Sequence, residues 1–186
     1  MTIVASAFWR RLDVPGHEAS RLQRTDTGWR LDGVAVFRHE AGPASLAYAV
    51  DCAADWETMA GQVHGLLGTR RIDYAAVRRD GAWALNGALV PGLDHLTDLD
   101  LGFTPATNLL PLRRVPIPDG ETAHLPAAWL DIDAGTLSEL AQTYQRRGEH
   151  AYWYEAPRFG YRGLLELAPD GFVRRYPELW EAEPPP

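Results

Sequence analysis

Residues 93–114 read L-D-H-L-T-D-L-D-L-G-F-T-P-A-T-N-L-L-P-L-R-R, and the rest of the chain is organised around this stretch. Apolar and polar residues alternate over 96–101, which is typical of a β-strand with carboxylates on one face and leucines on the other. Gly102 and the Thr104-Pro105 pair then predict turns. We therefore expect a short central strand and a folded-back segment that gathers polar side chains beside apolar walls.

Length and composition fit one domain that needs no covalent cross-links. The chain has 186 residues, enough to bury most of the apolar surface of a single domain. Cys52 is the only cysteine, so no intramolecular disulfide can form. The first residues lack the apolar run of a signal peptide, and no window is long and apolar enough to span a membrane. We therefore expect a cytoplasmic protein.

The charge balance argues against a nucleic-acid partner. The formal net charge is −7, and all 18 basic residues are arginine. Proteins that bind nucleic acids carry a basic stripe instead. No nucleotide-binding or nucleophile motif occurs, and the six histidines never fall at metal-ligand spacing. We therefore expect no nucleic acid, no cofactor and no metal.

Short apolar runs separated by glycine turns predict a mainly antiparallel β protein. Runs of strand character occur at 8–12, 18–25, 34–37, 45–51, 72–77, 127–132, 151–155, 161–167 and 172–176. Two segments are ambiguous. Residues 56–67 fit a helical face as well as a strand face, and residues 137–144 show a short, weak helical spacing. We expect few helices, all of them short.

One short pattern occurs twice. W-R-L-D-G at 29–33 resembles W-A-L-N-G at 83–87, and each copy follows a glycine turn. Asp-Gly and Asn-Gly pairs recur in any antiparallel protein, so turn chemistry alone explains the similarity. The alternative is a duplicated hairpin unit, with two similar halves packed side by side. The proline-rich residues 116–120 are the best candidate boundary between such halves.

Asp98 and Asp100 are the first candidate site residues, because alternation places them on the same face of the predicted strand. Two neighbouring carboxylates can act as an acid/base pair, since their repulsion raises one pKa. They can equally be neutralised by arginines or lie on a solvated face. Arg113 and Arg114 follow the turns and come within reach of that face. We therefore expect the four side chains to be energetically coupled, with an arginine bidentate to a carboxylate.

Other polar and aromatic side chains complete the candidate site. Thr104 and Asn108 can cap the backbone groups that the turn leaves free. A tyrosine has an apolar body and a polar tip, which suits the wall of an amphiphile pocket as well as a protein core. The candidate pocket tyrosines are Tyr144, Tyr152, Tyr154 and Tyr176.

With these residues in view, the chain resembles the bacterial glycolipid-binding domain family. The run D-L-D-L-x-x-T-P-A-T-N-x-L-P-x-R-R at 98–114 carries the resemblance and is specific to that family. Leu109 stands where the family pattern has Thr. The resemblance spans nearly the whole chain. Further matches are Trp83 with Asn86-Gly87, Gln142-Thr143-Tyr144, Tyr152-x-Tyr154 and Gly171-x-Val173-x-x-Tyr176-Pro177.

The resemblance implies a spiral β-roll, similar to the half-open barrels of bacterial lipid and lipoprotein carriers, with an internal duplication. We expect residues 1–180 to form this single β-roll domain, in two similar halves that meet near 116–120. Residues 181–186 have the composition of a Pro-rich disordered tail. The glycolipid label of the family rests on a likeness of fold to those carriers.

Three functions remain open, and we favour the binding of an amphiphile, a lipid or glycolipid, in a β-lined pocket. In that case Arg113 and Arg114 would meet an anionic or sugar head group. The alternatives are a small hydrolase or isomerase that uses Asp98 or Asp100 as general acid/base, and a structural or partner-binding β module. No residue is assigned a catalytic role, and no oligomeric state is predicted. The expected ligand-binding residues are Asp98, Asp100, Thr104, Asn108, Arg113, Arg114, Gln142, Tyr144, Tyr152, Tyr154 and Tyr176.

Overall fold

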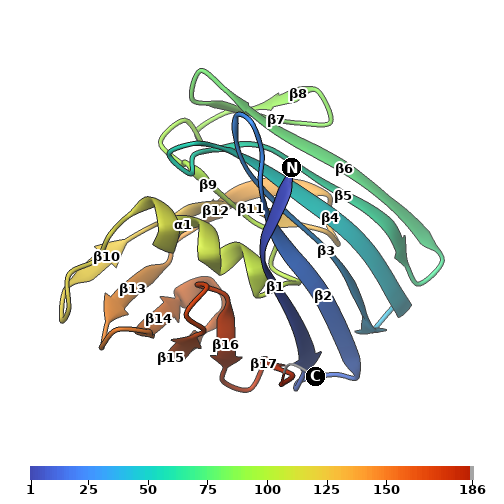
Figure 1. The fold of residues 1–186 in the computed structure, drawn as a ribbon. Coiled ribbons are helices and arrows are strands. Elements are labelled where there is room, and N and C mark those ends of the chain that lie inside the picture. Colours follow the sequence, from blue (N-terminus) through green and yellow to red (C-terminus); the bar gives the residue numbers. More distant parts are fainter. Residues whose placement is uncertain (185–186) are drawn as a thin grey trace.

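Antiparallel strands make up most of the structure (Figure 1). The computed structural model describes residues 1–184. Within this part, one short α-helix and two 3-10 helices are the only helical elements, and no helix is long and apolar enough to cross a membrane. The mainly β fold with few short helices is therefore confirmed. The elements are β1 (Thr2–Arg11), β2 (Gly16–Arg24), β3 (Gly28–His39), β4 (Gly42–Ala53), β5 (Thr58–Leu67), β6 (Arg70–Arg79), β7 (Ala82–Leu85), β8 (Ala88–Val90), β9 (Asp98–Asp100), η1 (Ala106–Asn108), α1 (Leu109–Arg114), β10 (Thr122–His124), β11 (Ala127–Asp131), β12 (Thr136–Leu140), β13 (Thr143–Arg146), β14 (Ala151–Ala156), η2 (Pro157–Phe159), β15 (Tyr161–Leu167), β16 (Val173–Tyr176) and β17 (Trp180–Ala182).

Alternation of buried and exposed residues explains why these segments are strands. In β4 every second residue faces the interior, so Leu46, Tyr48 and Val50 are buried. The two ambiguous segments follow the same rule. Residues 58–67 form β5, and residues 137–144 cover most of β12, a two-residue connection and the start of β13, so the weak helical spacing there did not indicate a helix.

The large sheet has 14 strands in the order β10-β13-β14-β15-β16-β17-β1-β2-β3-β4-β5-β6-β7-β8. It is not closed, because β10 and β8 lie at its two edges. Strands β1–β8 follow one another along one half, and the C-terminal strands form the other half. The halves meet where β17 pairs with β1, Trp9 opposite Ala182 and Arg10 opposite Glu181.

The junction between β1 and β17 corrects the expected C-terminal tail. Glu181 and Ala182 are strand residues rather than part of a disordered segment, and residues 185–186 lie outside the described part. The repeated tryptophan pattern falls in β3 and β7, which both belong to the N-terminal half. It therefore does not relate one half to the other, and the similarity of the halves stays a prediction.

A smaller sheet, in the order β12-β11-β9, lies inside the curve of the large one (Figure 1). Its strand β9 is the predicted central strand, and it runs parallel to β11. The chain then forms η1 and α1, where only turns were expected. Pro105 precedes η1 and Pro111 lies in the first turn of α1, positions where a proline costs no helical hydrogen bond.

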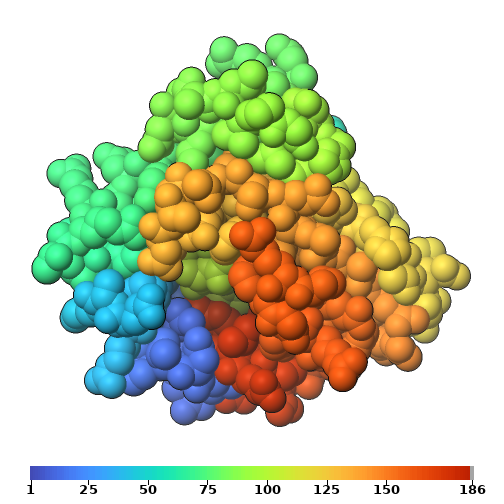
Figure 2. All heavy atoms as spheres, turned by 180° about the vertical axis from the view of Figure 1, so that it is seen from behind, coloured from blue at the N-terminus to red at the C-terminus, as the bar shows by residue number. Residues whose placement is uncertain are grey.

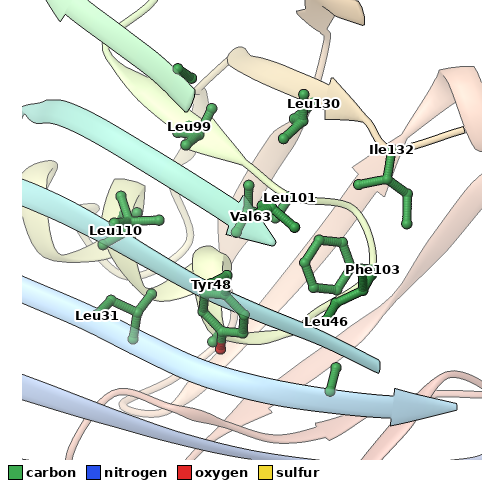
Figure 3. Close-up of a cluster of buried hydrophobic side chains, with 14 of the residues drawn as sticks. Leu31, Leu46, Tyr48, Val63, Leu99, Leu101, Phe103, Leu110, Leu130 and Ile132 are labelled. Atoms are coloured by element: carbon green, nitrogen blue, oxygen red, sulfur yellow. The ribbon is translucent and has the colours of Figure 1, made fainter. Parts of the chain in front are cut away.

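The segment from 93 to 117 fills the concave face of strands β1–β6. Leu99, Leu101, Phe103 and Leu110 are buried against the sheet (Figure 3). Gly61 of β5 makes room for this packing, because a Cβ there would lie 2.1 Å from Leu99 Cδ2. The interior of the N-terminal half is thus a packed core, and the sheet face that we expected to hold a ligand is covered by the chain itself.

We predict that Leu99→Ala lowers the free energy of unfolding by about 2–5 kcal/mol, because it removes buried contacts and leaves a void between β9 and β5. Leu89→Ala is the matched control, since Leu89 is 68% exposed on the edge strand β8. Its effect should stay within about 0.5 kcal/mol. Urea unfolding measures both. Equal losses in the two variants would contradict the central role of the 93–117 segment.

Candidate functional site

A cavity of about 300 Å³ lies between the central segment and the strands of the C-terminal half. In Figure 2 it is the hollow whose floor is green and whose rim is orange and red. The floor is polar and the walls are mostly aromatic. The residues around it are Asp100, Gly102, Thr104, Asn108, Leu140, Tyr154, Phe159, Tyr161, Tyr176, Leu179 and Trp180.

Asp100 forms the charged part of the floor. It ends β9, is 8% exposed, and its Oδ1 accepts a hydrogen bond of 2.8 Å from the backbone N–H of Gly102. Gly102 has φ 62°, and a Cβ there would lie 2.4 Å from Trp129 Nε1. Only glycine fits this turn, and the turn aims a backbone donor at the carboxylate.

Burial raises the pKa of Asp100 to about 6, and the hydrogen bond from Gly102 opposes the rise. The charge of Asp100 in turn raises the pKa values of Tyr144, Tyr154 and Tyr176, whose main cause of elevation is burial. These tyrosines stay protonated at neutral pH, so their hydroxyls remain hydrogen-bond donors.

The tyrosine wall comes from three neighbouring strands. Tyr154 of β14, Tyr161 of β15 and Tyr176 of β16 lie with ring centroids 5.0 to 6.1 Å apart. Burial raises the pKa of Tyr161 to about 12, and its hydroxyl donates a hydrogen bond of 2.9 Å to the carbonyl of Pro177. The rings are therefore held in place by their strands and by each other.

A second layer of polar side chains supports this wall from behind. Asn108 Nδ2 donates to the Tyr144 hydroxyl over 2.9 Å, and the Tyr154 hydroxyl donates to Gln142 Oε1 over 2.9 Å. All four side chains are buried. This chain of bonds connects the central segment to β13 and β14, so it fixes the floor of the cavity relative to its wall.

The expected cluster of two carboxylates and two arginines is reduced to one pair. Arg114 Nε and Nη2 lie 3.1 and 2.6 Å from the two carboxylate oxygens of Asp98, a bidentate geometry. Burial raises the pKa of Asp98, and the Arg114 guanidinium opposes that rise. The pair ties α1 to β9, and neither residue lines the cavity.

Arg113 points elsewhere, because α1 turns the side chains of adjacent residues in different directions. Its guanidinium is exposed, donates to the carbonyl of Asp170, and lies 5.7 Å from the Trp56 ring centroid. Tyr152 is buried in the core of the C-terminal half and does not line the cavity. The cavity thus brings together Asp100, Thr104, Asn108, Tyr154 and Tyr176 of the predicted residues, with Gln142 and Tyr144 behind them.

Sequence reasoning missed part of the wall. Phe159, Tyr161, Leu140, Leu179 and Trp180 also line the cavity. Alternation along β15 offered a signal for Tyr161, because Gly163 and Leu165 on the same face are buried. Phe159 lies in η2, where no periodic pattern identifies an inward side chain.

A buried acid next to the site was also missed. Glu18 of β2 is 1% exposed, and its Oε1 accepts hydrogen bonds of 2.5 Å from both Tyr48 and Thr104. Its Oε2 has no hydrogen-bond partner within residues 1–184. Burial raises the pKa of Glu18 from 4.5 to about 7, against the effect of these two bonds. Thr104 therefore contacts Glu18 on one side and the cavity on the other.

A larger and more open groove of about 1200 Å³ lies beyond the β16–β17 hairpin, on the outer face of β1–β3. We call it the outer groove. Some of its charged side chains form ion pairs, as Arg21 and Asp32 do at 2.9 Å. In the described part of the chain, no group of three or more His, Cys, Asp or Glu residues is placed to hold a metal ion.

Known proteins similar to this chain match it over most of its length. A family model described as "Putative glycolipid-binding" matches residues 6–182. The crystal structure of a DUF1089 family protein from Pseudomonas aeruginosa superposes with a TM-score of 0.77 at 25% sequence identity, covering 88% of this chain and 91% of the other. No curated protein matches the sequence.

We predict that Arg114→Gln destabilises the protein by about 3–5 kcal/mol, because it strands the buried charge of Asp98. Arg113→Gln, at an exposed site beside it, should cost less than about 1 kcal/mol. A double-mutant cycle in urea should give coupling above about 1 kcal/mol for Asp98→Asn with Arg114→Gln, and below about 0.5 kcal/mol for Asp100→Asn with Arg113→Gln. The reverse order would refute the observed pairing.

We also predict a pH dependence of stability that depends on Glu18. Because its folded pKa of about 7 lies above the usual 4.5, the folded state binds a proton that the unfolded state releases between these values. The resulting stability is complete below pH 4.5 and is lost as the pH rises through 7. Between pH 5 and pH 8 the wild type should therefore lose about 2 kcal/mol more than Glu18→Gln. Urea unfolding at several pH values checks this, and parallel profiles would contradict it.

Proposed function

Because the chain belongs to the glycolipid-binding family, we propose that it binds the head group of a lipid or glycolipid in the cavity beside Asp100. The observation that carries this proposal is the combination of a buried polar floor with a wall of tyrosine, tryptophan and phenylalanine rings in one concave site. Ligand sites typically pair such apolar walls with a few fixed polar groups.

The volume of the cavity limits what enters it. About 300 Å³ lies at the lower end of the range of small-molecule sites. A head group such as one sugar ring fits that space, whereas a long acyl chain does not. The apolar part of an amphiphile must then lie outside the cavity, against Phe159, which lines the cavity and is 52% exposed.

The polar groups suit a ligand that carries several hydroxyls. The Asp100 carboxylate accepts hydrogen bonds, and the protonated hydroxyl of Tyr176 donates them. The flat rings of Tyr154 and Trp180 offer apolar surface to the C–H face of a sugar ring. Most of these groups are rigidly held, which lowers the entropy lost on binding.

A second candidate function is supported by Asp100 alone. A general base works best when its pKa lies near the working pH, and burial raises the pKa of Asp100 to about 6. Asp98 cannot share this role, because Arg114 holds both of its oxygens. A proton-transfer reaction such as a sugar isomerisation needs one such base. The test is the exchange of solvent protons into a bound sugar: this function requires exchange in the wild type and its loss in Asp100→Asn.

We predict that octyl glucoside, used below its micelle concentration, binds to the wild type and binds about tenfold more weakly to Phe159→Ala, a loss near 1.4 kcal/mol. Phe8→Ala is the matched control, because Phe8 is 50% exposed and lines the outer groove instead. Both substitutions remove an exposed ring, so neither should unfold the protein. Isothermal titration calorimetry measures the affinities.

The two phenylalanine variants separate the two concave sites. Weaker binding in Phe159→Ala alone supports the cavity beside Asp100. Weaker binding in Phe8→Ala alone would move the amphiphile site to the outer groove and contradict the proposal. No binding of octyl glucoside or of its charged analogues to the wild type would remove amphiphile binding altogether.

A further inference from the structure

The cavity carries an unbalanced charge. Asp100 is the one ionisable acid among its lining residues, and no arginine or histidine lines it in the described part of the chain. The contrast with Asp98 is direct, because that carboxylate on the same strand has the Arg114 guanidinium at 2.6 Å. The cavity therefore places one buried carboxylate without a cation at the base of an enclosed space.

A carboxylate in this position is costly to the folded protein. Burying an ionised group without a counter-ion destabilises the folded state, because the charge loses its hydration and gains no opposite charge. Asp100 is 8% exposed, and the hydrogen bond from the Gly102 backbone satisfies only its Oδ1. The Thr107 hydroxyl also lowers the pKa of Asp100, but both of these partners are neutral, so no positive charge balances the carboxylate. A cationic ligand would remove the penalty by supplying the missing charge.

The aromatic wall has the arrangement that attracts a cation. The faces of aromatic rings carry negative potential, and cages of such rings recognise ammonium groups. The rings of Tyr154 and Tyr176 are inclined by 78°, and those of Tyr161 and Tyr176 by 60°. Rings at these angles surround a space from several sides, with Phe159 and Trp180 completing the wall.

We propose that the head group bound in this cavity carries an ammonium group, held between the Asp100 carboxylate and the tyrosine rings. The inference rests on the proposed function, because it specifies the head group of the same amphiphile. The ammonium belongs either to an amino sugar or to a choline-like group, and both provide the same charge. Anionic head groups are excluded, because the carboxylate repels them at close range.

The groups around Asp100 determine how the site responds to pH. Asp98 lies on the same strand but is paired with Arg114. Tyr144, Tyr154 and Tyr176 face Asp100 and stay protonated. Three charged groups lie farther off: Glu18 behind Thr104, Arg158 at the Trp129 ring and Glu178 near Tyr161. Asp100 is therefore the lining carboxyl that ionises near pH 6. Glu18, with a pKa of about 7, ionises in the same range behind Thr104, so the pH titration is made in Glu18→Gln.

Four octyl amphiphiles of equal chain length test the proposal by calorimetry. They are octyl glucoside, its 2-amino-2-deoxy analogue, octyltrimethylammonium and octyl sulfate, each below its micelle concentration. We expect at least one of the two cations to bind about tenfold or more tightly than octyl glucoside at pH 7, and octyl sulfate to bind most weakly. The tighter of the two cations identifies the source of the ammonium group.

Two further measurements tie the preference to Asp100. Between pH 7 and pH 5 the affinity for the preferred cation should fall about tenfold, because a carboxyl with a pKa of about 6 becomes mostly protonated. Asp100→Asn should bind cationic and neutral probes within about threefold of each other. Glu181→Gln, which neutralises a partly exposed acid of the outer groove, should keep the preference. The pH titration uses Glu18→Gln, which keeps Asp100 and removes the overlapping ionisation of Glu18, so it decides even where Asp100→Asn fails to fold.

The outcomes separate this inference from the function on which it rests. Equal affinities for octyl glucoside and both cations, or tightest binding of octyl sulfate, would overturn the ammonium assignment and leave amphiphile binding in place. A cation preference that persists unchanged at pH 5 would also overturn it. Failure of all four probes to bind would overturn the proposed function itself.

Discussion

The fold depends on one constraint: a strongly curved, open sheet must have its concave face filled. Residues 93–117 meet this need from within the chain, and Leu99 packs directly against Gly61 of β5. Hydrogen bonds hold the segment in register, because the Leu99 N–H donates to Thr58 Oγ1 over 3.2 Å. Without this segment, the apolar face of β3–β5 would be open to water, and the N-terminal half of the roll would lose the filling of its core.

The same segment also creates the site, because successive residues of a strand point to opposite faces. Leu99 and Leu101 enter the core of the N-terminal half. Asp98 and Asp100 point the other way, one to Arg114 and one into the cavity. Adjacent residues of this short segment therefore fill the core and line the cavity. Both roles fall within the run at 98–114 that resembles the family pattern.

The parts of this arrangement that depend on alternation along a strand could be predicted from the sequence. It predicted β9, the shared face of its two carboxylates and an arginine bidentate to one of them. It did not predict η1 and α1, because Thr104-Pro105 is typical of a turn, although a proline also fits the position just before a helix. Arg113 was misplaced for that reason, since a helix directs consecutive side chains along different faces.

The sequence did not predict the roles of Glu18 and Phe159, because these roles depend on tertiary contacts. Glu18 lies on the same face of β2 as the buried residues Ser20 and Leu22. What the sequence does not show is the return of Thr104 against the sheet, which gives this buried acid a hydrogen-bond partner. Phe159 enters the cavity wall through η2, whose position depends on the hairpin around it. Phe159 has no local pattern that distinguishes it, and the partners of Glu18, Tyr48 and Thr104, come from distant parts of the chain.

The joining of β1 to β17 has a consequence for folding. Trp9 Nε1 donates to the carbonyl of Val173, 164 positions away, over 2.6 Å. Contacts of such long range form late, because a large loop must close before they are gained. In the native molecule β17 pairs with β1 at Trp9, Arg10 and Arg11, while Ile3 and Val4 stay exposed farther along the strand. Until this short seam forms, the edge at residues 9–11 is also open to strand-to-strand aggregation, and the native pairing removes that hazard at these three residues.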